Sequence, residues 1–135
     1  MPSKLSFANT FRALERAIDI AHKRHVLIAG NISNLETPGY RAKEIDFRAA
    51  LDKALGHDSE FRLRRSDPRH IESGAISGRD FESFEEQGEW NGYNWVNIDR
   101  EMTKLIENNL RYRAATEILL RKINLLKEVI REGGR

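Results

Sequence analysis

The chain has 135 residues, which suits a single domain, and 33% of them are charged. Lys and Arg exceed Asp and Glu by two and are interleaved with them, which argues against a nucleic-acid-binding surface. The chain contains no cysteine, so disulfides and thiolate metal sites are excluded. Charged residues interrupt the apolar ones from the beginning, so neither a cleaved signal peptide nor a membrane-spanning helix is predicted.

The first predicted element is a long helix within residues 1–35. Its apolar positions recur at alternating intervals of four and three, the heptad pattern of a coiled coil. This predicted seam consists of Phe7, Phe11, Leu14, Ile18, Ala21, His25, Ile28, Ile32 and Leu35. From about residue 7 to residue 34, the helix would be roughly 40 Å long.

Residues 36–95 are predicted to hold a turn, a short helix and an irregular segment. Pro38 followed by Gly39 favours a type II turn that ends the first helix. Amphipathic spacing predicts a helix from about Glu44 to Leu55. Residues 56–95 have no sustained period, so we expect loops or short strands there. Residues 79–89 carry a net charge of −4, which could attract the basic C-terminal region or simply be solvated.

A second heptad helix is predicted within residues 96–135. Its seam consists of Ile98, Met102, Leu105, Asn109, Tyr112, Thr116, Leu119, Ile123, Leu126 and Ile130. Asn97 is a suitable N-cap, and Gly133 and Gly134 mark the end of the helix. The sequence therefore predicts a mainly α protein in which the N- and C-terminal helices pair as a coiled coil and form one assembly domain.

The end of the first helix carries a specific motif, Asn-Ile-Ser-Asn-Leu-Glu-Thr-Pro-Gly-Tyr, at residues 31–40. It resembles the signature that closes the N-terminal helix of flagellar rod and hook proteins. The matching residues are Asn31, Ile32, Asn34, Thr37, Pro38, Gly39 and Tyr40. Residues 107–116 and 125–133 also resemble the C-terminal helix of the proximal rod members of this family.

This resemblance implies a structural subunit that is exported unfolded by the flagellar type III export apparatus, without signal cleavage. It would assemble in the rod that spans the periplasm, transmit torque and form part of the export channel. The implied partners are copies of itself, other rod proteins, the export apparatus and an adaptor protein that links the rod to the membrane-supramembrane ring. Phe7 and Phe11 resemble an export recognition element, although both also fit as the first seam residues.

Other interpretations remain open at this stage. His22 and His25 have a metal-ligand spacing, but a plain helix-surface role is far commoner, so no ligand is assigned. Asn31, Asn34 and Asn109 could set the register of the helices, and for Asn34 a role at the helix end is favoured. No catalytic or cofactor-binding residue is predicted. The alternative function is a cytosolic coiled-coil interaction or regulatory protein, which would leave the Thr37–Tyr40 motif unexplained.

Overall fold

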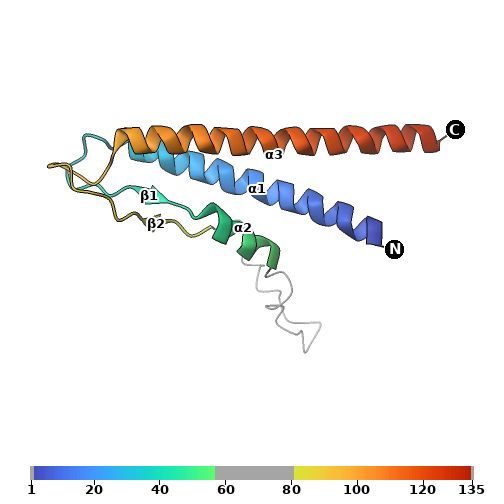
Figure 1. The fold of residues 1–135 in the computed structure, drawn as a ribbon, viewed down its shortest axis with the longest axis horizontal. Helices are drawn as coiled ribbons and strands as arrows, with labels where there is room; N and C mark the ends of the chain where they lie inside the picture. Colours follow the sequence, from blue (N-terminus) through green and yellow to red (C-terminus); the bar gives the residue numbers. More distant parts are fainter. Residues whose placement is uncertain (1, 57–80, 135) are drawn as a thin grey trace, which may run out of the picture.

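A computed structural model describes residues 2–56 and 81–134 of the chain. The elements in order are α1 (Pro2–Ser33), β1 (Lys43–Glu44), α2 (Phe47–Gly56), β2 (Phe84–Glu85) and α3 (Ile98–Gly133). Figure 1 shows α1 and α3 running side by side in opposite directions, with the shorter elements along α1. The prediction of a mainly α fold with paired terminal helices is confirmed.

The contacts between α1 and α3 establish their antiparallel register. Lys122 places its ammonium 5.0 Å from the centre of the Phe7 ring. Further along α1, the Ala21 carbonyl accepts a hydrogen bond of 2.8 Å from Asn108. As the residue number rises along α1, the residues of α3 that contact it come earlier in the chain. The two helices are therefore antiparallel.

The ends of α3 are set by local sequence signals, as expected. The Asn97 side chain accepts a hydrogen bond of 3.2 Å from the backbone N–H of Arg100, which confirms the predicted N-cap. Asp99 and Glu101 place negative charge in the first turn, where the helix dipole favours it. Gly134 is the C-cap.

The first helix ends at Ser33, and Asn34 bonds to its last turn. Both the backbone N–H and the side-chain Nδ2 of Asn34 donate to the Gly30 carbonyl, at 3.1 and 2.8 Å. These bonds satisfy a carbonyl that the helix itself leaves without a partner. The predicted role of Asn34 at the helix end is therefore confirmed.

The short helix α2 begins later than predicted. Glu44 belongs to β1, and the Asp46 side chain accepts a hydrogen bond of 3.0 Å from the Ala49 N–H, so Asp46 caps the helix. The strand β1 pairs with β2 in an antiparallel ladder, with Lys43 opposite Glu85. The expectation of short strands is met at β2, while residues 57–80 lie outside the described residues.

A small apolar core lies where α1, α2 and the residues before β2 meet. Ile20, Ile45 and Phe81 are buried together, and partly buried side chains of α1 and α2 pack against them. The partly buried residues are Leu27, Phe47, Ala50, Leu51 and Ala54. This cluster holds α2 against α1 and leaves most of α3 outside the core. Within residues 2–56 and 81–134, no helix is both long and apolar enough to cross a membrane.

Candidate assembly site

The motif at the end of α1 forms the tight turn that its sequence predicts. The Tyr40 N–H donates to the Thr37 carbonyl at 3.3 Å, and Gly39 has a φ of 70°. Pro38 occupies the second position and Gly39 the third, as in a type II turn. Thr37 Oγ1 also donates to Asn34 Oδ1 at 2.9 Å, which ties the turn to the end of the helix.

Asn94 fastens the end of α1 to the segment that enters α3. Its side chain is fully buried, and Nδ2 donates to the Leu35 carbonyl at 2.7 Å. Its Oδ1 accepts the Val96 N–H at 3.0 Å. The sequence reasoning missed this role, because nothing in the local pattern links Asn94 to a helix end 59 residues earlier.

Two backbone hydrogen bonds run beside Asn94 and complete the junction. The Gly39 N–H donates to the Tyr93 carbonyl, and the Trp95 N–H donates to the Tyr40 carbonyl, both at 3.0 Å. The motif is thus joined through its backbone to the segment that precedes α3. Residues 34–41 and 85–95 are hereafter called the turn surface, at the end of the molecule opposite the C-terminus (Figure 1).

Asn31 is the motif residue that contacts both neighbouring elements. Its fully buried amide donates to the Lys43 carbonyl and to Glu101 Oε2, each at 2.8 Å. Its Oδ1 accepts the Lys43 N–H at 2.8 Å and the Tyr40 hydroxyl at 3.4 Å. One side chain therefore fixes α1, β1 and α3 relative to one another.

A buried network of charged side chains extends from Asn31 along the interface between α1 and α3. Arg24 donates two hydrogen bonds to the Glu44 carboxylate, at 2.8 and 2.9 Å. Lys104 donates to Glu86 at 2.6 Å and to Glu101 at 2.9 Å. Lys104 also lies 3.4 Å from Glu44, so it connects the two halves of the network. The contact with Glu86 joins the acidic segment to the basic C-terminal region within one chain.

The surroundings of Glu44 and Lys104 favour the charged forms of these two side chains. Burial opposes ionisation of Glu44, but hydrogen bonds from Arg24 and from the Ile45 N–H, with the nearby cations, lower its pKa. Burial likewise opposes the charge of Lys104, yet its bonds to Glu86 and Glu101 raise its pKa. Buried ion pairs contribute little net stability, but they disfavour any arrangement that leaves one charge unpaired. The network therefore specifies the register of the helices.

The structure places the predicted seam of α1 mostly toward the interior. Ile28 and Ala21 are buried, whereas His25 is exposed. The remaining seam residues are partly buried: Phe7, Phe11, Leu14, Ile18, Ile32 and Leu35.

The predicted seam of α3 differs from the face that α3 buries. Leu105, Leu119 and Ile123 are partly buried, but Met102, Tyr112 and Leu126 are exposed. Met102 is 44% exposed, whereas its neighbour Glu101 is 1% exposed. The buried positions of α3 are all polar: Glu101, Lys104 and Asn108. The spacing of apolar residues in the sequence could not identify this face of α3, because the face is buried through hydrogen bonds and ion pairs of polar side chains.

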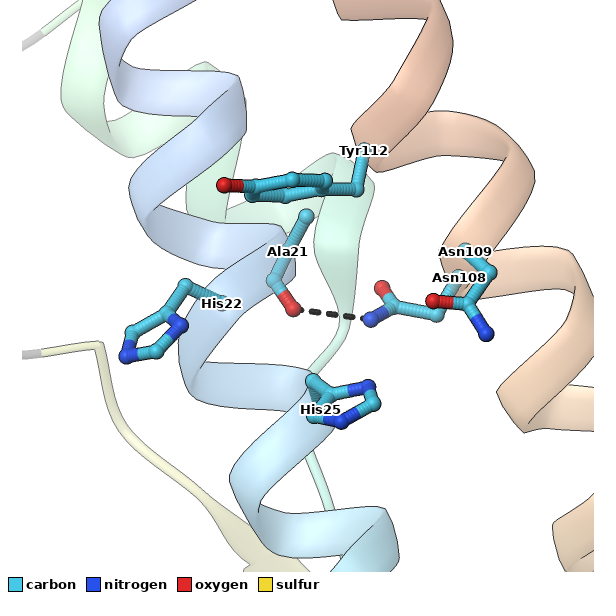
Figure 2. Close-up of a pocket in the computed structure, with 6 residues that line it drawn as sticks. All are labelled: Ala21, His22, His25, Asn108, Asn109 and Tyr112. Atoms are coloured by element: carbon cyan, nitrogen blue, oxygen red, sulfur yellow. Dashed lines mark hydrogen bonds between the residues drawn. The ribbon is translucent and has the colours of Figure 1, made fainter. Parts of the chain in front are cut away.

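Asn108, rather than the predicted Asn109, is the buried asparagine of α3. Figure 2 shows its amide directed at the Ala21 carbonyl across the interface. This contact borders a pocket of about 170 Å³ that His22, His25 and Tyr112 also line. The described residues contain no group of three or more side chains suited to hold a metal ion.

Aromatic side chains pair in two places. The Phe7 and Phe11 rings pack against each other at a tilt of 50°, with ring centres 5.0 Å apart, near the start of α1. Trp90 and Trp95 lie 4.5 Å apart on the turn surface, and the Arg41 guanidinium covers the Trp95 ring at 4.3 Å.

Two long antiparallel helices, joined at one end by the motif turn and exposing apolar side chains along α3, define a helical assembly protein. The chain is 32% identical over 133 residues to the flagellar basal body rod protein FlgB of Bacillus subtilis (strain 168), covering 94% of this chain and 97% of that protein. It belongs to the FlgB family of flagellar basal body rod proteins.

Two further relatives support the same assignment over nearly the whole chain. FlgB of Escherichia coli (strain K12) is 31% identical, covering 99% of this chain and all of that protein. FlgB of Yersinia ruckeri is 30% identical, covering 98% and 100%. A scan against protein-family profiles finds no match. The chain is therefore a structural component of the flagellar basal body rod.

Proposed function

We propose that this protein assembles with copies of itself into the proximal rod, where it transmits torque and forms part of the export channel. The observation that carries this proposal is the number of large apolar side chains on α3 that are at least 37% exposed. They are Ile98, Met102, Ile106, Leu110, Tyr112, Ile118, Leu120, Leu125, Leu126, Val129 and Ile130. So large an apolar surface is characteristic of a protein that buries it against neighbours.

Torque transmission requires subunits that keep their shape under load. The hydrogen bonds of Asn31 and the ion pairs of Lys104 supply this rigidity, since sliding α3 past α1 would leave buried polar groups unpaired. We propose that the motif residues Asn31, Ile32, Asn34, Thr37, Pro38, Gly39 and Tyr40 set the direction in which the chain leaves α1. The turn surface then reaches the adjacent subunit.

The partners and the route follow from the rod family to which the chain belongs. We propose contacts with other rod proteins and with the adaptor protein that links the rod to the membrane-supramembrane ring. The chain would reach the periplasm through the flagellar type III export apparatus without signal cleavage. Phe7 and Phe11 would be recognised in the unfolded chain and become packed against each other after folding, which makes the export and seam roles compatible.

Electron microscopy of purified basal bodies tests this function. We expect antiparallel pairs of helices with the dimensions of α1 and α3 in the rod next to the inner membrane. Deletion of the gene should remove the rod and abolish motility. Normal rods in the deletion strain, or a chain found only in the cytosol, would overturn the proposal and favour a cytosolic coiled-coil regulator.

A pair of substitutions on α1 separates assembly from export. Ile28→Asp places a charge at a fully buried position, which costs several kcal/mol unless the charge is paired. We expect this variant to be secreted but absent from rods. Val26→Asp adds the same charge at an exposed position of the same helix and should assemble normally. Leu119→Asp tests the partly buried face of α3 in the same way.

A further inference from the structure

We infer that the turn surface of one copy binds the C-terminal part of α3 in the next copy, in a head-to-tail contact. This inference rests on the proposed self-assembly and specifies which surfaces meet. Residues 118–131 of α3 are called the α3 tail. Figure 1 shows that the tail extends beyond the start of α1, at the opposite end of the molecule from the turn surface.

The turn surface presents aromatic side chains on a fixed backbone. Trp90 is 53% exposed and Tyr93 48% exposed. The loop that carries them is held by Asn91, whose Oδ1 accepts the N–H groups of Tyr93 and Asn94 at 2.9 and 2.8 Å. Its Nδ2 donates to the Val96 carbonyl at 3.0 Å. Exposed aromatics that are already ordered bind with little further loss of entropy, which suits an interface.

The α3 tail presents the apolar surface that such aromatics would cover. Leu125 and Val129 are four residues apart on the helix, as are Leu126 and Ile130, so the two pairs form adjacent rows. All four side chains are exposed. Apolar area buried between two chains contributes about 25 cal/mol per Å², so this surface favours association once it is covered.

The charges of the two surfaces are complementary. The turn surface contains four glutamates and one arginine, Arg41, whereas the α3 tail contains four basic residues and one glutamate. Glu86 already pairs with Lys104 inside the chain, whereas Glu36 and Glu89 of the turn surface are exposed. Lys127 and Arg131 are exposed beside the apolar rows. Opposite charges steer and orient an encounter between two such surfaces.

The position of the two surfaces determines what kind of assembly results. Because they differ and lie at opposite ends, each copy can use its tail and its turn surface at the same time. Such a heterologous contact repeats without limit unless the rotation closes a ring. With α3 about 54 Å long, repetition produces an elongated helical filament.

Cysteine cross-linking tests the contact directly, since the chain contains no native cysteine. The full chain would carry both Tyr93→Cys and Ile130→Cys, and mild oxidation would be applied to concentrated protein and to purified basal bodies. We expect a ladder of disulfide-linked oligomers, because each copy contributes two different ends. The pair Tyr93→Cys and Arg113→Cys, with the second thiol in the middle of α3, should give no ladder beyond dimers.

Charge reversal provides an independent measurement by sedimentation velocity, with helix content checked by circular dichroism. Glu89→Lys and Lys127→Glu should each weaken self-association roughly tenfold, and the double variant should regain wild-type association within about twofold. Arg113→Glu is the matched control and should change association less than twofold. If no ladder forms in either preparation, or the double variant is no better than the singles, the head-to-tail contact is wrong. The proposed rod function would then still stand if the chain is found in the rods.

Discussion

Asn31 on α1 donates a hydrogen bond of 2.8 Å to the carboxylate of Glu101 on α3, although the two residues are 70 positions apart. Glu101 is almost completely buried, and its other carboxylate oxygen accepts a hydrogen bond from Lys104. The motif asparagine therefore acts at the interface between the two helices as well as at the end of its own helix. It couples the start of α3 to the turn.

Replacing this asparagine should destabilise the fold strongly. Asn31→Leu leaves the Lys43 backbone and part of the Glu101 carboxylate buried without their partner, so we expect the free energy of unfolding to fall by about 2–4 kcal/mol. Urea denaturation followed by circular dichroism measures the change. Asn109→Leu, at an exposed asparagine of α3, should change it by less than about 0.5 kcal/mol. Equal effects of the two substitutions would contradict the role of Asn31.

The lowered pKa of Glu44 predicts a loss of stability in acid. Because the pKa in the folded state lies below the ordinary value near 4.5, its contribution is complete above that value and is lost as the pH falls through the folded pKa. Urea midpoints of the wild type should therefore decline below about pH 4.5. The urea midpoint of Glu44→Gln should be lower than that of the wild type at pH 7 and should vary less with pH. The midpoints of the two proteins should therefore approach each other in acid. Glu128→Gln, at an exposed position, should follow the wild type.

The turn at Gly39 should accept asparagine better than valine. A φ of 70° is accessible to asparagine, whereas a β-branched residue is strained there by about 1–3 kcal/mol. No neighbouring atom lies within 4 Å of the position of an added Cβ, so the effect arises from the backbone alone. Rods would be counted in strains that express each variant at matched levels. If valine and asparagine give the same number of rods, the turn geometry is not what assembly requires.

Two other glycines should respond to alanine in opposite directions. At Gly88 an added Cβ would lie 2.7 Å from the Trp95 carbonyl oxygen, so Gly88→Ala should cost about 1–3 kcal/mol by forcing the two segments apart. At Gly30, inside α1, nothing lies within 4 Å, so Gly30→Ala should stabilise the protein by about 0.5–1 kcal/mol. Thermal unfolding of both variants checks the contrast. A melting temperature lowered by both changes would refute the helix-propensity argument.

The elements that local chemistry determines could be predicted from the sequence. The heptad spacing indicated both long helices, Asn97 marked the start of α3, and Pro38 with Gly39 indicated the turn. Each of these depends on residues within one or two helical turns, so its signal is contained in a short window. The start of α2 was misplaced, because the pairing of Glu44 with Arg24 comes from a residue 20 positions away.

The buried face at the start of α3 could not be predicted for the same reason. Spacing assigned Met102 to the interior, but the structure buries Glu101 and Lys104 instead. A charged residue can take a buried position only when its partners are in place, and here they come from α1, β1 and the segment after β2. The role of Asn94 was hidden in the same way, since its acceptors belong to the end of α1.

The bonds of Asn94 and Trp95 to residues 35 and 40 mean that the chain leaves α1 and returns to α3 at the same point. The segment that carries β1, α2 and β2 is therefore anchored at its base, where the two helices meet. The register of α1 against α3 is thus fixed at this junction and by the side chains that bond across the interface, so it does not depend on how far the chain travels between the two helices.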